Sequence, residues 1–114
     1  MPYVQIRTNK EISKEKELAI KERLGRAITL LGKTEQWLMV DIEDSCRMYM
    51  GGEDNKGIAY VCVKILGRSN DEAYNGFTKE VTDMLVELGE DLTPDHVYIS
   101  YDEYERWGWN GSNL

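Results

Sequence analysis

The sequence predicts an α+β fold, in which a four-stranded sheet carries two helices on one face. Two observations lead to this prediction. Polar and apolar residues alternate in four segments, and apolar residues recur at helical spacing in two longer ones, so that the order strand, helix, strand occurs twice. The chain has 114 residues, 41% of them hydrophobic, which suits one domain over residues 1–114 with a core of its own.

The first unit runs from a strand at 3–7, through a helix, to a strand at 38–43. Ser13 is placed to cap the start of the helix, because its side chain can accept a hydrogen bond from the first turn. Gly32 stands just after the last apolar residue of the helical pattern, where a left-handed backbone favours glycine. Both ends therefore agree with the helical spacing between them.

The second unit repeats this order. A long strand is expected at 58–66, and the helix after it begins at a cap formed by Asn70 or Asp71 and ends at Gly89. The closing strand is expected at 96–102.

The two units correspond in sequence. Strand starts at positions 3 and 59 lie 56 residues apart, and the helix-ending glycines at 32 and 89 lie 57 apart, which indicates an internal duplication of a β-α-β unit. The glycine-rich linker carries a short strand at 48–50. Each main strand has one nearly apolar face, which we assign to the helices. The opposite face mixes charged residues with tyrosines, and we expect it to be solvated or to line a wet interior between subunits.

The charge and hydropathy of the chain argue against several classes of function. Lys and Arg number 14 and Asp and Glu 21, which gives a net charge of −7, so we expect no nucleic-acid partner. No apolar run reaches the roughly 20 residues that span a bilayer, so no membrane insertion is expected. The first residues lack the apolar stretch of a signal peptide, so we expect a cytoplasmic protein.

Few residues suit metal or cofactor chemistry. His96 is the only histidine, which excludes a histidine-based metal cluster, and no glycine-rich phosphate loop is present. We therefore expect neither a metal nor a cofactor. Cys46 and Cys62 are expected to be free thiols, with a single disulfide as the alternative.

Pro2 is the first candidate for chemistry. Removal of the initiator methionine would leave a secondary amine, whose pKa falls towards neutrality when it is buried or close to a cation. Such an amine can move a proton on carbon as a general base. The alternative is a proline that merely opens an edge strand.

Three further features are candidates for a binding site. Lys33 follows the helix stop, where it either offers a cation to an anionic substrate or is simply solvated. Trp37 is expected to open the next strand. The tail carries Trp107 and Trp109, whose rings need cover within the fold, at a subunit interface or in a pocket wall. The tail also reads NGS at 110–112, which matches a glycosylation acceptor.

Several features occur together in one known pattern. They are the Met-Pro start, Thr8-Asn9 after the first strand, LGK at 31–33, a Met-Gly-Gly turn at 50–52, Gly67 after the long strand, TPDHVYISY at 93–101 and GWNGS at 108–112. Together with the duplicated β-α-β order, this pattern resembles the macrophage migration inhibitory factor family of the tautomerase superfamily over essentially the whole chain.

The resemblance implies a homotrimer, in which three four-stranded sheets surround a central channel and each active site lies between subunits. It further implies a cofactor-free phenylpyruvate tautomerase, in which Pro2 is the general base that moves a proton between carbon and oxygen of a small aromatic α-keto acid. The implied substrate-binding residues are Lys33 for the carboxylate, Leu66 and Ser100 in the pocket, Tyr98 from the neighbouring subunit, and Trp37, Trp107 and Trp109 at the mouth and wall.

The sequence also departs from the family pattern. Ser100 stands where the family has asparagine, Tyr3 where the animal proteins have methionine, and Leu114 at a pocket phenylalanine, so the substrate preference is not carried over. The Cys-x-x-Cys motif of the animal cytokine is replaced by residues 58–61, and we expect no thiol oxidoreductase activity.

Two other functions are left open. One is a cytokine-like protein, secreted without a signal peptide, that binds a cell-surface receptor. The other is a ferredoxin-like nucleic-acid module, which has the same β-α-β-β-α-β order but needs a basic setting that a net charge of −7 does not provide.

Overall fold

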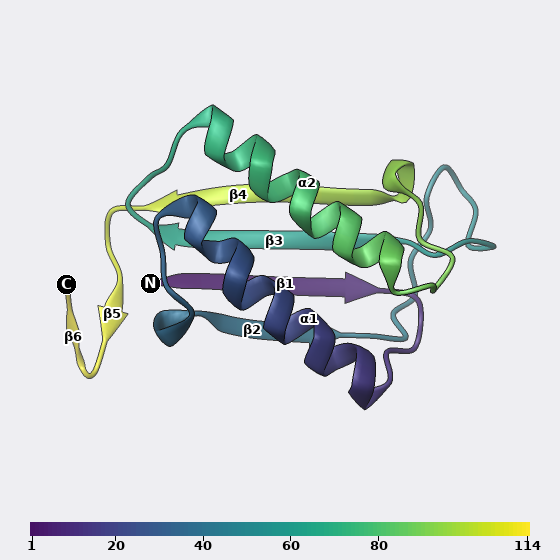
Figure 1. Cartoon of the computed structure of the whole chain (residues 1–114), viewed down its shortest axis with the longest axis horizontal. Coiled ribbons are helices and arrows are strands. Elements are labelled where there is room, and N and C mark those ends of the chain that lie inside the picture. Colours follow the sequence, from purple (N-terminus) through teal and green to yellow (C-terminus); the bar gives the residue numbers. More distant parts are fainter.

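The sheet of the protein, seen in a computed structural model that describes all 114 residues, has the strand order β2-β1-β3-β4 and confirms the predicted α+β class (Figure 1). Its strands are β1 (Pro2–Thr8), β2 (Met39–Glu43), β3 (Ala59–Leu66) and β4 (Val97–Tyr104), and both helices, α1 (Lys14–Ala27) and α2 (Asp71–Glu87), cover one face. The remaining elements are three 3₁₀ helices, η1 (Ile28–Leu31), η2 (Glu35–Trp37) and η3 (Pro94–His96), and a C-terminal hairpin of β5 (Gly108–Trp109) and β6 (Ser112–Asn113).

The two β-α-β units are arranged as the duplication predicts. Helix α1 connects the parallel strands β1 and β2, and α2 connects the parallel strands β3 and β4. The units join where β1 runs antiparallel to β3 at the centre of the sheet. Pro2 therefore opens a central strand and not an edge strand.

The helix ends follow the predicted caps. The side chains of Ser13 and Asn70 accept hydrogen bonds from the backbone N–H three residues further on, at 3.2 and 2.9 Å. Gly32 and Gly89 both have a left-handed backbone, with φ of 73° and 76°. The first helix differs from the prediction in its last turn, which is the 3₁₀ helix η1.

Trp37 does not open a strand, so this prediction is wrong. It lies in η2, because the N–H groups of Trp37 and Leu38 donate to carbonyls three residues earlier, at 3.2 and 3.0 Å. Strand β2 begins only at Met39. The turn places the indole beside the sheet and not within it.

Two strand predictions also need correction. The strand expected at 48–50 is reduced to one bridge between Met50 and Glu53, because the two glycines between them have positive φ and turn the chain back at once. Strand β4 runs two residues further than predicted, to Tyr104, because its partner β3 continues to Leu66.

The hairpin of β5 and β6 is absent from the sequence prediction. Asn110 and Gly111 form its two-residue turn, and both have positive φ, at 53° and 86°. An Asn-Gly pair favours this kind of turn. The glycosylation match at 110–112 therefore overlaps a turn signal.

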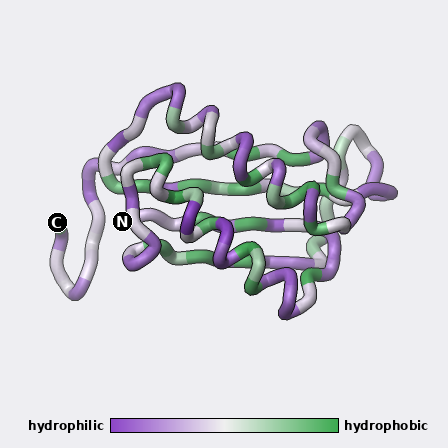
Figure 2. Tube along the Cα trace, viewed as in Figure 1, coloured by the Kyte–Doolittle hydropathy of each residue, from purple (hydrophilic) through white to green (hydrophobic).

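The core lies between the sheet and the two helices, and apolar residues of every main strand pack in it or against it. Hydrophobic positions recur along all four strands (Figure 2). This arrangement confirms the assignment of the apolar faces. Its buried members are Val4, Ile6, Ile20, Leu24, Ile28, Leu31, Ala59, Val61, Val63, Ile65, Phe77, Val81, Met84, Leu85 and Leu92.

The outer face of the sheet is polar and aromatic, as predicted. Met39 and Tyr98 are exposed there, at 65% and 61% of their surface. Cys46 and Cys62 are both free thiols, which confirms the prediction. Neither helix has the length and apolar character of a membrane span.

Candidate functional site

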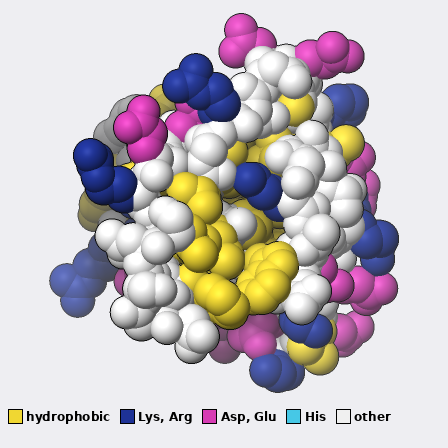
Figure 3. All heavy atoms as spheres, turned by 90° about the vertical axis from the view of Figure 1, so that its left-hand side faces the viewer, with side chains coloured by type: hydrophobic (Ala, Val, Ile, Leu, Met, Phe, Trp, Pro, Cys, Tyr) yellow, Lys and Arg dark blue, Asp and Glu magenta, His cyan; other side chains and the backbone are white.

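A cavity of about 610 Å³ lies at the end of the sheet where the chain starts. It forms a hollow in which hydrophobic side chains surround a basic one (Figure 3). The residues that line it are Met1, Pro2, Tyr3, Gln36, Trp37, Leu38, Met39, Lys64, Trp107, Gly108 and Trp109. The structure thus brings Pro2 together with all three tryptophans that the sequence analysis singled out.

Pro2 is buried at the first position of β1, opposite Ile65 of β3. The carbonyl of Met1 accepts a hydrogen bond from the N–H of Leu66 at 3.1 Å. Burial, and then the charge of Lys33, lower the pKa of the terminal amine on Met1 below its ordinary value of 8.0. The start of the chain is therefore an environment that favours a neutral amine.

Lys33 reaches the same point from the other side. It follows the left-handed Gly32 at the end of η1, and its Nζ donates to the carbonyl of Leu66 at 2.9 Å. The N–H of Leu66 binds the chain start, while its carbonyl binds the ammonium. Lys33 does not line the large cavity, so its ammonium lies near the chain start but outside the aromatic walls.

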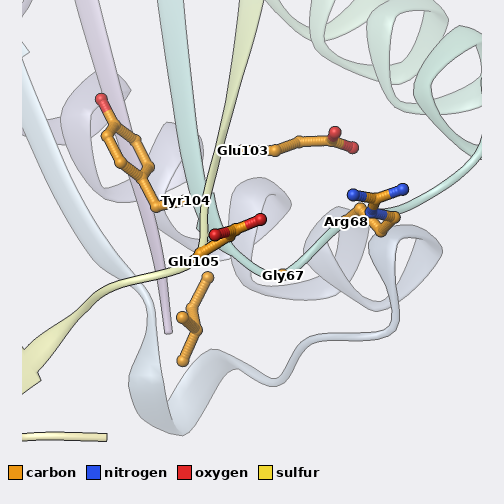
Figure 4. Close-up of a pocket in the computed structure, with 6 residues that line it drawn as sticks. Gly67, Arg68, Glu103, Tyr104 and Glu105 are labelled. Carbon is orange, nitrogen blue, oxygen red and sulfur yellow. The ribbon is translucent and has the colours of Figure 1, made fainter.

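Leu66 lines a second cavity of about 390 Å³, with Gly67, Arg68, Glu103, Tyr104 and Glu105 (Figure 4). The Glu103 carboxylate accepts hydrogen bonds from the Tyr74 hydroxyl at 2.5 Å and from the Ser69 N–H at 3.2 Å. These bonds, with the nearby charge of Arg68, lower the pKa of Glu103. This second cavity thus has both signs of charge, unlike the first.

Aromatic pairs hold the wall of the large cavity. The rings of Trp37 and Trp109 meet edge to face, with centroids 5.2 Å apart and planes at 85°. Tyr104 and Trp107 make a similar contact at 6.0 Å and 71°. Such T-shaped contacts are a preferred aromatic geometry. They connect the C-terminal hairpin to η2 and to the end of β4.

Tyr98 and Ser100 lie elsewhere in the chain. They are near the start of β4, where they pair with Tyr60 and Cys62, whereas Pro2 lies beside the end of β3. The Ser100 hydroxyl bonds that of Tyr60 at 2.5 Å. Within one chain these two residues are therefore remote from Pro2, and their role at a neighbour's site stays a prediction.

Several lining residues were not expected from the sequence, chiefly Lys64 and Tyr3. The Tyr3 hydroxyl donates to the Asp41 carboxylate at 2.6 Å, and this bond, before burial, raises the pKa of Tyr3 to about 12. The phenol therefore stays protonated at neutral pH and does not compete with an amine as the base. No group of three or more His, Cys, Asp or Glu side chains is placed to share a metal ion.

The sequence matches the family model of Macrophage migration inhibitory factor (MIF) over residues 1–114. A comparison with curated protein sequences finds no significant match.

Solved structures share the fold. MIF2 from Leishmania major has 22% identity and a TM-score of 0.90, covering 100% of this chain and 97% of that one. The MIF homologue from Prochlorococcus marinus has 24% identity and a TM-score of 0.84, covering 97% of each chain. The protein Pt0534, inactivated by 2-oxo-3-pentynoate, has 17% identity and a TM-score of 0.83, covering 96% of this chain and 93% of that one.

Proposed function

Because the chain belongs to the macrophage migration inhibitory factor family, we propose that it is a cofactor-free keto-enol tautomerase that acts on α-keto acids of the phenylpyruvate type. The observation that carries this proposal is the position of Pro2, which is buried at the start of a central strand and lines an aromatic cavity. Removal of Met1 turns the Pro2 nitrogen from an amide into a secondary amine at that position.

The proposed reaction needs one base and no added atoms. The neutral Pro2 nitrogen takes a proton from the carbon next to the ketone, so that a C–H bond breaks and an N–H bond forms. The electron pair moves onto the ketone oxygen as an enolate. The ammonium then returns the proton to that oxygen, which completes the enol, and the reverse sequence gives the ketone.

The neighbouring groups support this assignment. Burial and then the charge of Lys33 lower the pKa of the amine on Met1, and we expect the same two causes to favour the neutral form of an amine at the buried Pro2. In the proposal Lys33 binds the carboxylate of the substrate. The side chains of Trp37, Trp107 and Trp109 enclose the aromatic ring of the substrate. Leu66 does not line this cavity but the neighbouring one, and its carbonyl binds Lys33.

The proposed enzyme is a homotrimer with its sites between subunits. Tyr98 and Ser100 are remote from Pro2 along the strands of one chain, so they can complete a site only if a neighbouring copy supplies them. The exposed Met39 and Tyr98 on the outer sheet face also favour a subunit contact.

A labelling experiment tests the base. We propose that 2-oxo-3-pentynoate, the compound that inactivated Pt0534, adds to the Pro2 amine: an N–C bond forms, and the amine proton moves to the carbon skeleton of the reagent. Peptide mass mapping should locate one equivalent on Pro2, with loss of phenylpyruvate tautomerisation in step with labelling. Inactivation with the label on Lys33, or labelling of Pro2 with full activity, would exclude Pro2 as the base.

The cytokine-like function stays a prediction, as does secretion. The Pro2→Gly variant separates it from catalysis, because a receptor that recognises the surface of the protein would bind this variant while tautomerisation falls.

A further inference from the structure

Lys64 is the only charged side chain among the residues that line the large cavity. It lies on the outer face of β3, opposite Tyr3 of β1. The other lining side chains are apolar or aromatic, apart from the amide of Gln36, and none of them is acidic. The Lys64 side chain is 38% exposed, so its ammonium can meet an anionic group of a ligand that enters the cavity.

The contacts of Lys64 leave part of its ammonium available. Its Nζ donates to the Tyr104 hydroxyl at 3.2 Å and lies 5.7 Å from the centre of that ring. An ammonium has three donors, so two remain after this bond. The Asp102 carboxylate lies 4.0 Å away, at the limit of an ion pair, and its side chain is 54% exposed. Water therefore weakens the competing charge of Asp102.

Lys33 and Lys64 occupy different places around the chain start. Lys33 binds the backbone of Leu66 outside the large cavity, whereas Lys64 stands within its wall, two residues earlier on β3. Two positions along a strand correspond to about 6.6 Å. A substrate with one carboxylate can neutralise only one of these cations.

We propose that Lys64 binds a second negative charge on the substrate, so that the enzyme prefers an aromatic α-keto acid with a carboxylate on its ring over phenylpyruvate itself. This inference rests on the tautomerase function proposed above. It assigns Lys33 to the carboxylate beside the ketone and Lys64 to the far end of the molecule.

The test compares 4-carboxyphenylpyruvate with phenylpyruvate as substrates of the chain that starts at Pro2. The ratio of their kcat/KM values should exceed one for the unaltered protein. Lys64→Met should lower this ratio by about tenfold or more, the scale of one lost charge-assisted hydrogen bond. Lys64→Arg, which keeps the charge, should retain the preference.

Two further variants complete the design. Asp102→Asn removes the competing carboxylate, so it should raise the ratio by about two- to threefold, and it tests the proposal without altering Lys64. The matched control is Lys79→Met, since Lys79 is exposed on α2 and paired with Asp83 at 2.9 Å. The ratio of the two kcat/KM values should be the same in this variant as in the unaltered protein.

A ratio of one or below in the unaltered protein would overturn the proposal. So would an equal loss on both substrates in Lys64→Met, or a ratio that Asp102→Asn leaves unchanged. These results would leave the tautomerase function standing, because phenylpyruvate would still be turned over. If the unaltered protein turned over neither compound, the proposed function would fail together with this inference.

Discussion

The backbone of Leu66 lies between the chain start and the lysine to which we assign the substrate carboxylate. Its carbonyl accepts a hydrogen bond from Lys33 at 2.9 Å, and in the chain that keeps Met1 its N–H donates to the Met1 carbonyl at 3.1 Å. A flexible lysine is thus tied to a backbone atom at the end of a central strand. The ammonium therefore stays close enough to lower the pKa of an amine at the chain start.

Lys33→Ala and Pro2→Gly should change different kinetic parameters. Lys33→Ala should raise KM for phenylpyruvate by about tenfold with little change in kcat, because a charge-assisted contact to the carboxylate is worth roughly 1.5 to 3 kcal/mol. Pro2→Gly should lower kcat, because a primary amine replaces the secondary amine in its ring. Steady-state kinetics of both variants check this. A lower kcat with unchanged KM in Lys33→Ala would place that residue in the proton-transfer transition state.

Some site residues follow from the sequence and others do not. Pro2 and Lys33 stand in recognisable sequence motifs, so both are candidates from the residues alone, and their chemical roles stay predictions. The alternation of β3 places Lys64 on the outer face, but it does not reveal that the tail folds over that end of the sheet. The cavity wall depends on contacts such as Trp37 with Trp109, which are separated by most of the chain.

At the scale of elements, the C-terminal hairpin positions the aromatic wall. Gly111→Ala should weaken its turn by about 1 kcal/mol, because a left-handed φ of 86° suits only glycine well. Loosening the contact of Trp109 should raise KM for phenylpyruvate by up to about fivefold and reduce the near-ultraviolet circular dichroism. Gly76→Ala is the control: Gly76 lies inside α2 with open space around an added Cβ, so that variant should be as stable or more stable. Equal KM values in the two variants would show that the hairpin turn does not shape the site.

The short helix η3 predicts a pH effect on stability. Hydrogen bonds from the Thr93 hydroxyl and then from His96 lower the pKa of Asp95 from 3.8 to about 2. Because the folded state favours the charged form, this stabilisation is present above about pH 4 and is lost as the pH falls towards 2. Asp95→Asn should therefore lower the melting temperature at pH 7 but not at pH 2. A difference that persists at pH 2 would contradict this origin.

The regular elements are the part of the fold that the sequence predicts best. Caps such as Ser13 and Asn70 are local signals, and they form the expected bonds. The errors fall where the chain turns within a few residues, at Trp37 and around Met50, because a short apolar run does not distinguish a strand from a tight turn. The Asn110-Gly111 pair is a local turn signal that the sequence prediction did not use.

The outer face of the sheet has the exposed apolar surface that the proposed trimer would cover. Met39 and Tyr98 are more than half exposed there, and β2 and β4 are edge strands with one unpaired side each. We expect a trimer, so light scattering at micromolar concentration should give three times the 13.2 kDa of one chain. A mass near 13.2 kDa would contradict both the trimer and a site shared between subunits.

Periodicity and caps do not predict which copy supplies each group, and the supply of Tyr98 by a neighbouring subunit is a prediction from the family resemblance alone. The β-α-β duplication explains why Tyr98 and Pro2 lie towards opposite ends of the sheet, since each stands near the start of its strand and β4 runs antiparallel to β1. In the proposed trimer, Tyr98 of one copy and Pro2 of another would meet at one site.

The most direct test of Pro2 as the base compares two forms of the same chain, one starting at Pro2 and one that keeps Met1, each identified by its intact mass. We expect only the form starting at Pro2 to tautomerise phenylpyruvate, because in the other form the Pro2 nitrogen is an amide and cannot accept a proton. Equal activity of the two forms would show that another group is the base.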